Sequence, residues 1–187
     1  MHPWYTHYDP GVPKEAPRPW LLTDLLRENA RRYPHKEALE FLGRSLSYRN
    51  LWQQVEAFAK GLQEAGLKPG DRVAIMLPNS PQFVIAFYGT LLAGGVAVNT
   101  NPMYTPRELG HQLRDSGARV LVILDLLLPR YQEVKAEAPV EVLVRTGIQD
   151  YLPFPKNLLY PLMLKRKGQA PRSLEGTPWR AFLKPGN

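Results

Sequence analysis

The sequence predicts an α/β fold, in which a doubly wound, mostly parallel sheet is flanked by helices. Between residues 66 and 124, short apolar runs alternate with helix signals in the order strand, helix, strand, helix, strand. One of these helices starts at Ser80, a capping residue, with Pro81 at the first helical position. The next starts at residues 105–108, where a capping box is combined with an N-terminal proline. Helices that alternate with apolar strands are typical of a parallel sheet covered on both faces.

Residues 1–20 are expected to form an extended arm, because they contain five prolines. Disordered tails seldom carry many aromatic residues, so this arm is expected to pack on a surface. Arms of this kind often cross onto a neighbouring subunit, and a homodimer contact through the N-terminal region is therefore one expected interaction. The aromatic residues behind this expectation are Trp4, Tyr5, Tyr8 and Trp20.

The next segment predicts a helix, a hairpin and a second helix. Thr23 is expected to cap a helix over residues 25–33. Residues 37–42 and 45–48 alternate apolar and polar side chains around a Gly-Arg pair, which is typical of a β-hairpin. A long helix is expected over residues 48–65, because apolar residues recur there at helical spacing. This stripe consists of Leu51, Val55, Phe58, Ala59, Leu62 and Ala65.

In the central stretch, strands are expected at residues 72–77, 96–99 and 118–124. The helix that follows Ser80 is apolar on nearly every side, so it should be buried on more than one face. Glycines end both helices of this stretch, because glycine accepts the left-handed conformation at a helix C-terminus. These glycines are Gly94, Gly95 and Gly117.

Residues 126–138 are expected to add a helix and residues 140–145 a strand, which completes an α/β subdomain over residues 21–147. From residue 148 the composition changes. Residues 148–187 are predicted to form a basic, proline-rich tail that is incomplete without a following segment. One helix is expected in this tail, at residues 158–167.

The net charge of +7 is concentrated in this tail, since residues 151–187 contain seven basic residues and one acidic residue, or +6. The fold itself is close to neutral, so no nucleic-acid partner is predicted. The apolar residues ahead of Lys165, Arg166 and Lys167 fit a peripheral membrane contact. A short solvated helix end explains the same residues more simply.

Other classes of protein are excluded by composition. The chain has no cysteine, which rules out disulfides, thiolate metal sites and a cysteine nucleophile. Residues 73–106 carry no charge, but prolines, asparagines and glycines interrupt them below the roughly 20 apolar residues of a membrane span. The first residues lack a basic start and an apolar signal core. A cytoplasmic protein is expected, with membrane association limited to the peripheral contact of the tail.

The sequence does not single out a catalytic or metal-binding residue. The turn of residues 77–81 has no glycine that would let the backbone approach a phosphate, and the chain has no Walker loop or nucleophile elbow. Asn79 and Ser80 precede a helix and are weak candidates for holding an anion, and a plain helix cap at Ser80 with a turn at Asn79 is the favoured explanation. None of the histidines has a second ligand at metal spacing, and His111 is interpreted as a solvated helix residue.

Two segments resemble core motifs of the adenylate-forming enzymes, the superfamily of acyl-CoA synthetases, luciferases and peptide-synthetase adenylation domains. Residues 46–51, Leu-Ser-Tyr-Arg-Asn-Leu, resemble the first motif, with Asn50 in place of the usual glutamate. Residues 91–102, which lead from Leu-Ala-Gly-Gly into a strand and Asn-Pro, resemble the second. Residues 150–161 are similar to a segment of bacterial long-chain fatty-acyl-CoA synthetases. The resemblance covers essentially the whole chain.

This resemblance implies an ATP-dependent fatty acid–CoA ligase that uses ATP, Mg²⁺ and CoA. The family's Ser/Thr/Gly-rich phosphate loop, which ends in Pro-Lys-Gly, and its later adenylation motifs do not occur in these 187 residues. We therefore expect the N-terminal portion of such an enzyme, which binds none of these cofactors and is inactive without the remainder of the parent chain as its partner. A non-catalytic scaffold or dimerisation module of the same fold is the alternative.

Overall fold

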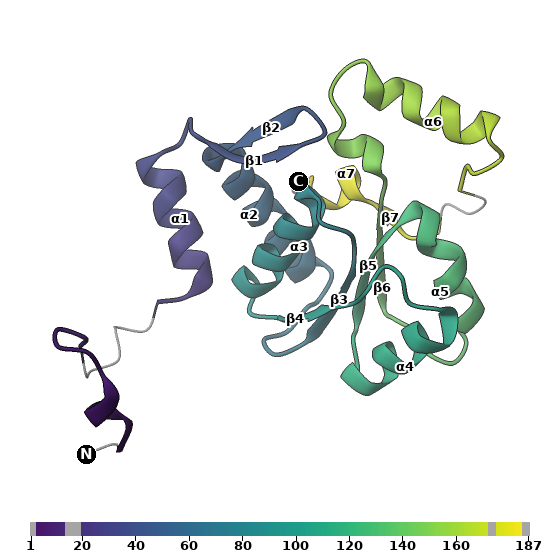
Figure 1. The fold of residues 1–187 in the computed structure, drawn as a ribbon. Coiled ribbons are helices and arrows are strands. Elements are labelled where there is room, and N and C mark those ends of the chain that lie inside the picture. Colours follow the sequence, from purple (N-terminus) through teal and green to yellow (C-terminus); the bar gives the residue numbers. More distant parts are fainter. Residues whose placement is uncertain (1–2, 14–19, 172–174, 185–187) are drawn as a thin grey trace.

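The computed structural model describes residues 3–13, 20–171 and 175–184 and contains a five-stranded, wholly parallel sheet (Figure 1). Its strand order is β4-β3-β5-β6-β7. The predicted doubly wound α/β fold is thereby confirmed. The strands are β3 (Arg72–Met76), β4 (Val96–Asn99), β5 (Val120–Leu124), β6 (Val142–Thr146) and β7 (Thr177–Pro178).

Helices cover both faces of this sheet (Figure 1). Successive residues of a strand point to opposite faces, so Val73 and Ile75 of β3 join one core cluster, while Ala74 and Met76 join the other. The first cluster contains side chains of four helices, α1 (Leu22–Arg32), α2 (Tyr48–Glu64), α3 (Pro81–Leu92) and α7 (Trp179–Phe182). The second contains those of α4 (Pro106–Ser116) and α5 (Leu128–Val134).

The predicted helix signals in the central stretch act as expected. The Ser80 hydroxyl accepts a hydrogen bond from the backbone N–H of Phe83 and caps α3. Thr105 and Glu108 form the capping box of α4, and that helix ends at Gly117, whose φ is +58°. Local capping interactions therefore mark the residues at which both helices begin.

The segment before β3 contains α1 (Leu22–Arg32) and an antiparallel hairpin, β1 (Glu37–Phe41) with β2 (Arg44–Ser47). The hairpin is confirmed, but the prediction that Thr23 caps the first helix is wrong. Residue Leu21 occupies the cap position, and Thr23 lies buried in the first turn. The Asp24 carboxylate accepts the backbone N–H of Leu21 instead, at 3.3 Å.

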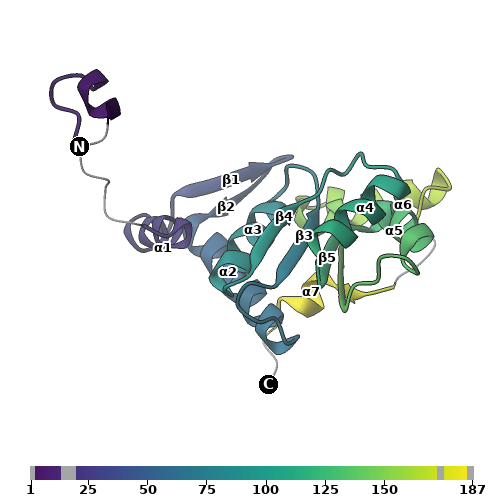
Figure 2. The same cartoon turned by 90° about the horizontal axis from the view of Figure 1, so that it is seen from below.

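The N-terminal arm contains a 3₁₀ helix, η1 (Pro3–His7), where an extended segment was expected. Its aromatic rings contact one another, with centroid distances of 6.2 Å for Trp4 and Tyr5 and 5.7 Å for Tyr5 and Tyr8. In Figures 1 and 2, η1 lies apart from the sheet and its helices. A homodimer contact through this arm stays a prediction.

The segment after β5 differs in detail from its prediction. A 3₁₀ turn, η2 (Asp125–Leu127), precedes α5, and α5 ends at Val134, four residues short of the expected end. After β6 the chain forms a second 3₁₀ turn, η3 (Ile148–Tyr151), and the predicted helix of the tail, α6 (Lys156–Arg166).

The sequence showed no further regular structure beyond α6, and here the structure adds β7 and α7. Strand β7 pairs with β6, and α7 places Trp179 and Phe182 in the core. A two-residue strand that contains a proline has no periodicity to detect. Parts of the predicted arm (residues 1–2 and 14–19) and tail (residues 172–174 and 185–187) lie outside the described residues.

None of the helices that the structure describes combines the length and the apolar character needed to cross a membrane.

Candidate functional site

The strand order identifies one edge of the sheet as the place for a ligand. The chain runs from β3 to β4 on one side and then returns to form β5 on the other side of β3. In open α/β sheets, ligands bind outside the carboxyl ends of the strands at such a switch point. The candidate site is therefore formed by the segments that follow β3, β5 and β6.

The anion candidates Asn79 and Ser80 follow β3 at this switch point. Ser80 is buried, and its hydroxyl is engaged by the N–H of Phe83 at 3.4 Å. Asn79 is exposed beside it. Prolines at positions 78 and 81 lack an N–H, so the turn offers few backbone donors to an anion. Binding of an anion by Asn79 and Ser80 stays a prediction.

A buried hydrogen-bond network joins the start of α3 to the end of β6. The amide nitrogen of Gln82, which is fully buried, donates to the Thr146 hydroxyl at 3.2 Å and to the Gly147 carbonyl at 3.0 Å. The Asp150 carboxylate then accepts from the Thr146 hydroxyl at 2.9 Å and from the Gly147 N–H at 3.0 Å. This network fixes the backbone where β6 ends.

Two arginines from distant elements hold Asp150 from outside. Arg180 of α7 lies 3.2 Å from the Asp150 carboxylate, and Arg44 of β2 donates to the Asp150 carbonyl at 3.1 Å. The hairpin, η3 and α7 are thereby tied together at one corner of the molecule.

Tyr151 extends this corner into the core. Its hydroxyl donates to the side-chain oxygen of Gln54 on α2 and accepts from the Trp179 indole N–H at 3.1 Å. Burial raises the pKa of Tyr151 to about 12, against a smaller opposing effect of the Trp179 hydrogen bond. Tyr151 is therefore a neutral structural hydroxyl at physiological pH.

Asp125 directly follows β5 and is the charged group buried at the switch point. It is 7% exposed, and its carboxylate lies 3.8 Å from the Arg145 guanidinium of β6. One carboxylate oxygen has no hydrogen-bond partner among the described residues. The carboxylate borders a cavity of about 100 Å³ between the strand ends and α6, lined also by Ile148, Tyr160 and Leu164.

Burial raises the pKa of the Asp125 carboxyl above its ordinary value, and the Arg145 charge opposes this only in part. The folded state then binds a proton more readily than the unfolded state. The protonated Asp125 carboxyl thus stabilises the fold at pH values below its pKa in the unfolded chain, about 4. This stabilisation is lost as the pH rises through the higher pKa of the folded protein.

We expect Asp125→Asn to gain stability relative to the wild type over this pH interval. Urea unfolding of both proteins between pH 3.5 and 7 measures this, and a difference that does not vary with pH would contradict it.

The described residues of this site do not fit a magnesium-bound triphosphate. Such a group needs glycine-rich backbone or several cations close by, whereas the turn after β3 is proline-rich and the switch point holds the Asp125 carboxylate. Within the described ranges, no three or more His, Asp or Glu side chains gather as metal ligands. The arrangement can orient the backbone at the sheet edge, but it supplies no reacting group.

Most residues of this site could not be singled out from the sequence. Gln82 and Thr146 are separated by 64 positions, and Trp179 lies in the segment for which no structure was predicted. One signal was present: Asp125 and Thr146 are polar residues at or directly after the end of an apolar strand. Polar residues in that position meet at the carboxyl edge of a parallel sheet.

The sheet order and its polar carboxyl edge define a doubly wound α/β protein. The model of the AMP-binding enzyme family matches residues 26–178, and the chain therefore belongs to this family. The resemblance seen in residues 46–51 and 91–102 is thereby confirmed.

The similar proteins include several long-chain-fatty-acid–CoA ligases. The ligase of Bacillus subtilis (strain 168) is 46% identical over 88% of this chain, and that of Escherichia coli O157:H7 is 38% identical over 87%. The crystal structure of a long-chain-fatty-acid-CoA ligase (FadD1) from Archaeoglobus fulgidus matches 74% of this chain with a TM-score of 0.65 at 25% identity. The chain spans 29–30% of the length of these relatives.

Proposed function

We propose that this chain is the N-terminal portion of an ATP-dependent long-chain fatty acid–CoA ligase. In the proposed reaction, the fatty acid carboxylate attacks the α-phosphorus of ATP, which forms an acyl-adenylate and releases pyrophosphate. The thiol of CoA then attacks the acyl carbonyl, and AMP leaves. The observation that carries this proposal is the 46% identity to the Bacillus subtilis ligase over 88% of the chain.

In this proposal the chain contributes a rigid framework to the enzyme. The Gln82–Thr146–Asp150 network holds the backbone after β6, and Asp125 and Ser80 flank the switch point beside it. The side-chain polar groups of this network are engaged by hydrogen bonds or by the ion pair with Arg180, apart from the side-chain oxygen of Gln82. ATP, Mg²⁺ and CoA would be held mainly by polypeptide that corresponds to the rest of the relatives' length.

The 187-residue chain alone is expected to show no fatty-acid-dependent exchange between ATP and pyrophosphate, because the described residues provide no site for a triphosphate. The assay uses purified chain with palmitate, Mg²⁺ and labelled pyrophosphate, and the complete Bacillus subtilis ligase serves as the positive control. Exchange that depends on palmitate and rises with the concentration of the chain would contradict this expectation.

A chimera tests the proposed function directly. In it, this chain replaces the matching 30% of the Bacillus subtilis ligase. We expect the chimera to form palmitoyl-CoA. A second chimera that also carries Asp150→Ala is a control for correct folding of the inserted chain. It should unfold at a lower temperature than the first chimera. A first chimera that is folded and binds ATP but forms neither acyl-adenylate nor acyl-CoA would overturn the proposal.

A further inference from the structure

Helix α6 exposes a row of large apolar side chains. Leu158, Leu159 and Leu162 are 60%, 57% and 59% exposed, and Met163 is also exposed. Residues four apart share a face of a helix, so Leu158 and Leu162 lie together, as do Leu159 and Met163. Leu164 alone among the residues of α6 is buried. The side of α6 that faces away from the sheet, here called the outer face, is therefore apolar.

Basic residues lie at both ends of this outer face. Lys156 begins α6, Lys165 and Arg166 end it, and Lys167 follows directly. Residues 151–174 contain no aspartate or glutamate. None of these four cations has an ion-pair partner among the residues that the structure describes.

Helix α1 differs from α6 in how its charges are paired. Helix α1 also exposes leucines and carries three arginines. There, however, Arg27 pairs with Asp24, while Arg31 and Arg32 both pair with Glu28. The charge of α1 is thus largely compensated within the helix, whereas that of α6 is not compensated by any ion pair among the described residues.

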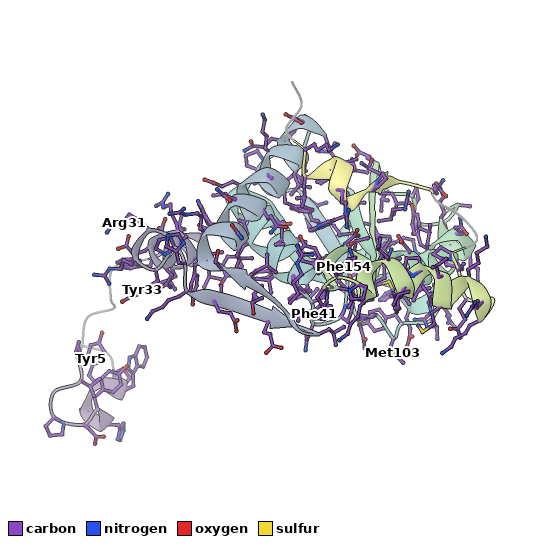
Figure 3. All side chains as sticks on the ribbon, turned by 90° about the horizontal axis from the view of Figure 1, so that it is seen from above. Tyr5, Arg31, Tyr33, Phe41, Met103 and Phe154 are labelled. Carbon is purple, nitrogen blue, oxygen red and sulfur yellow. The ribbon has the colours of Figure 1, made fainter. Side chains whose placement is uncertain are left out.

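None of the residues that the structure describes covers the outer face of α6. The helix lies at the periphery of the molecule, beyond the carboxyl edge of the sheet (Figure 1). Phe154, just before α6, is 80% exposed and is labelled in Figure 3, which views the molecule from this side. A shallow apolar groove of about 320 Å³ runs beside α6, lined by Leu42, Leu152 and Leu159 among others, with Lys156 as the charged residue in its lining.

We propose that the outer face of α6 binds the surface of an anionic lipid bilayer. The leucines and Phe154 enter the boundary between headgroups and acyl chains, and the four cations pair with lipid phosphates. This occupant satisfies both features of the face, since a bilayer offers apolar depth and negative charge side by side. A polypeptide that covered only the leucines would leave four cations without partners. Lipid binding by α6 does not require ligase activity. An experiment can therefore contradict the lipid-binding proposal without contradicting the proposed ligase function, and the reverse also holds.

The absence of cysteine allows a clean test of this binding. Leu162→Cys, labelled with an environment-sensitive fluorophore, places a probe on the outer face. Leu22→Cys on α1 is the matched control, because Leu22 is 51% exposed. With vesicles of phosphatidylcholine and phosphatidylglycerol, we expect a blue shift and stronger emission from the probe at position 162 only. Pure phosphatidylcholine vesicles should have a much weaker effect.

Charge variants supply the second arm of the experiment. Lys165→Ser, Arg166→Ser and Lys167→Ser together should weaken binding to the anionic vesicles about a hundredfold, since each basic residue near such a surface contributes roughly fivefold. Arg27→Ser, Arg31→Ser and Arg32→Ser remove the same charge from α1 and should leave binding within about twofold. Wild-type binding should also fall as salt is raised. Circular dichroism checks that both variants are folded.

Three outcomes would overturn the proposal. The first is a probe at position 162 that does not respond to anionic vesicles. The second is an equal loss of binding in both triple variants, which would indicate net charge without a specific face. The third is a lipid-independent change in emission that grows with protein concentration, because a second copy of the chain would then cover the outer face.

Discussion

Replacing Trp179 with alanine is expected to lower the free energy of unfolding by about 3–5 kcal/mol, the range for removing a buried aromatic side chain. Trp179 is 2% exposed, and its ring centroid lies 5.3 Å from that of Phe58 on α2. Its indole N–H also donates to the Tyr151 hydroxyl at 3.1 Å. The substitution therefore removes a core contact and a buried hydrogen bond together.

Urea unfolding followed by circular dichroism measures this effect. Trp20→Ala is the matched control, because Trp20 is 61% exposed and should change stability by less than about 0.5 kcal/mol. Trp179→Phe keeps most of the packing and is expected to lose about 1–2 kcal/mol, so it remains informative if Trp179→Ala does not fold. Equal stability of Trp179→Ala and Trp20→Ala would mean that α7 does not pack on the core.

The second large effect is expected at Asp150, where alanine should cost about 3 kcal/mol. The substitution leaves the buried Thr146 hydroxyl and the Gly147 N–H without their acceptor, and a buried unsatisfied donor costs roughly 1–3 kcal/mol. The ion pair with Arg180 is lost as well, although Arg180 is largely exposed and contributes little.

Thermal and urea unfolding of the variant, with Asp115→Ala as control, test this prediction. Asp115 is an exposed carboxylate near the end of α4 and should be neutral to stability. Asp150→Asn retains one acceptor oxygen and is expected to fall between the wild type and Asp150→Ala. If Asp150→Ala proved as stable as Asp115→Ala, the network at the end of β6 would not stabilise the fold.

Within the candidate site, local and long-range features differ in how far the sequence predicted them. The role of Ser80 as a helix cap was predictable, because its partner, Phe83, is three residues away. Gln82 was not, because it is one polar residue in an apolar helix and its partners lie 64 and 65 positions further on. The burial of Asp125 depends on α6 and on β6, which come together only in the folded chain.

The sequence by itself determined the order of the elements from β1 to β6, the parallel sheet and the family of the chain. These depend on interactions within about one helical turn, such as the capping box of Thr105, and on the alternation of apolar residues. Only the tertiary structure decided the fifth strand and the place of Trp179 in the core. Both depend on partners distant in the chain, and a local pattern carries no information about such partners.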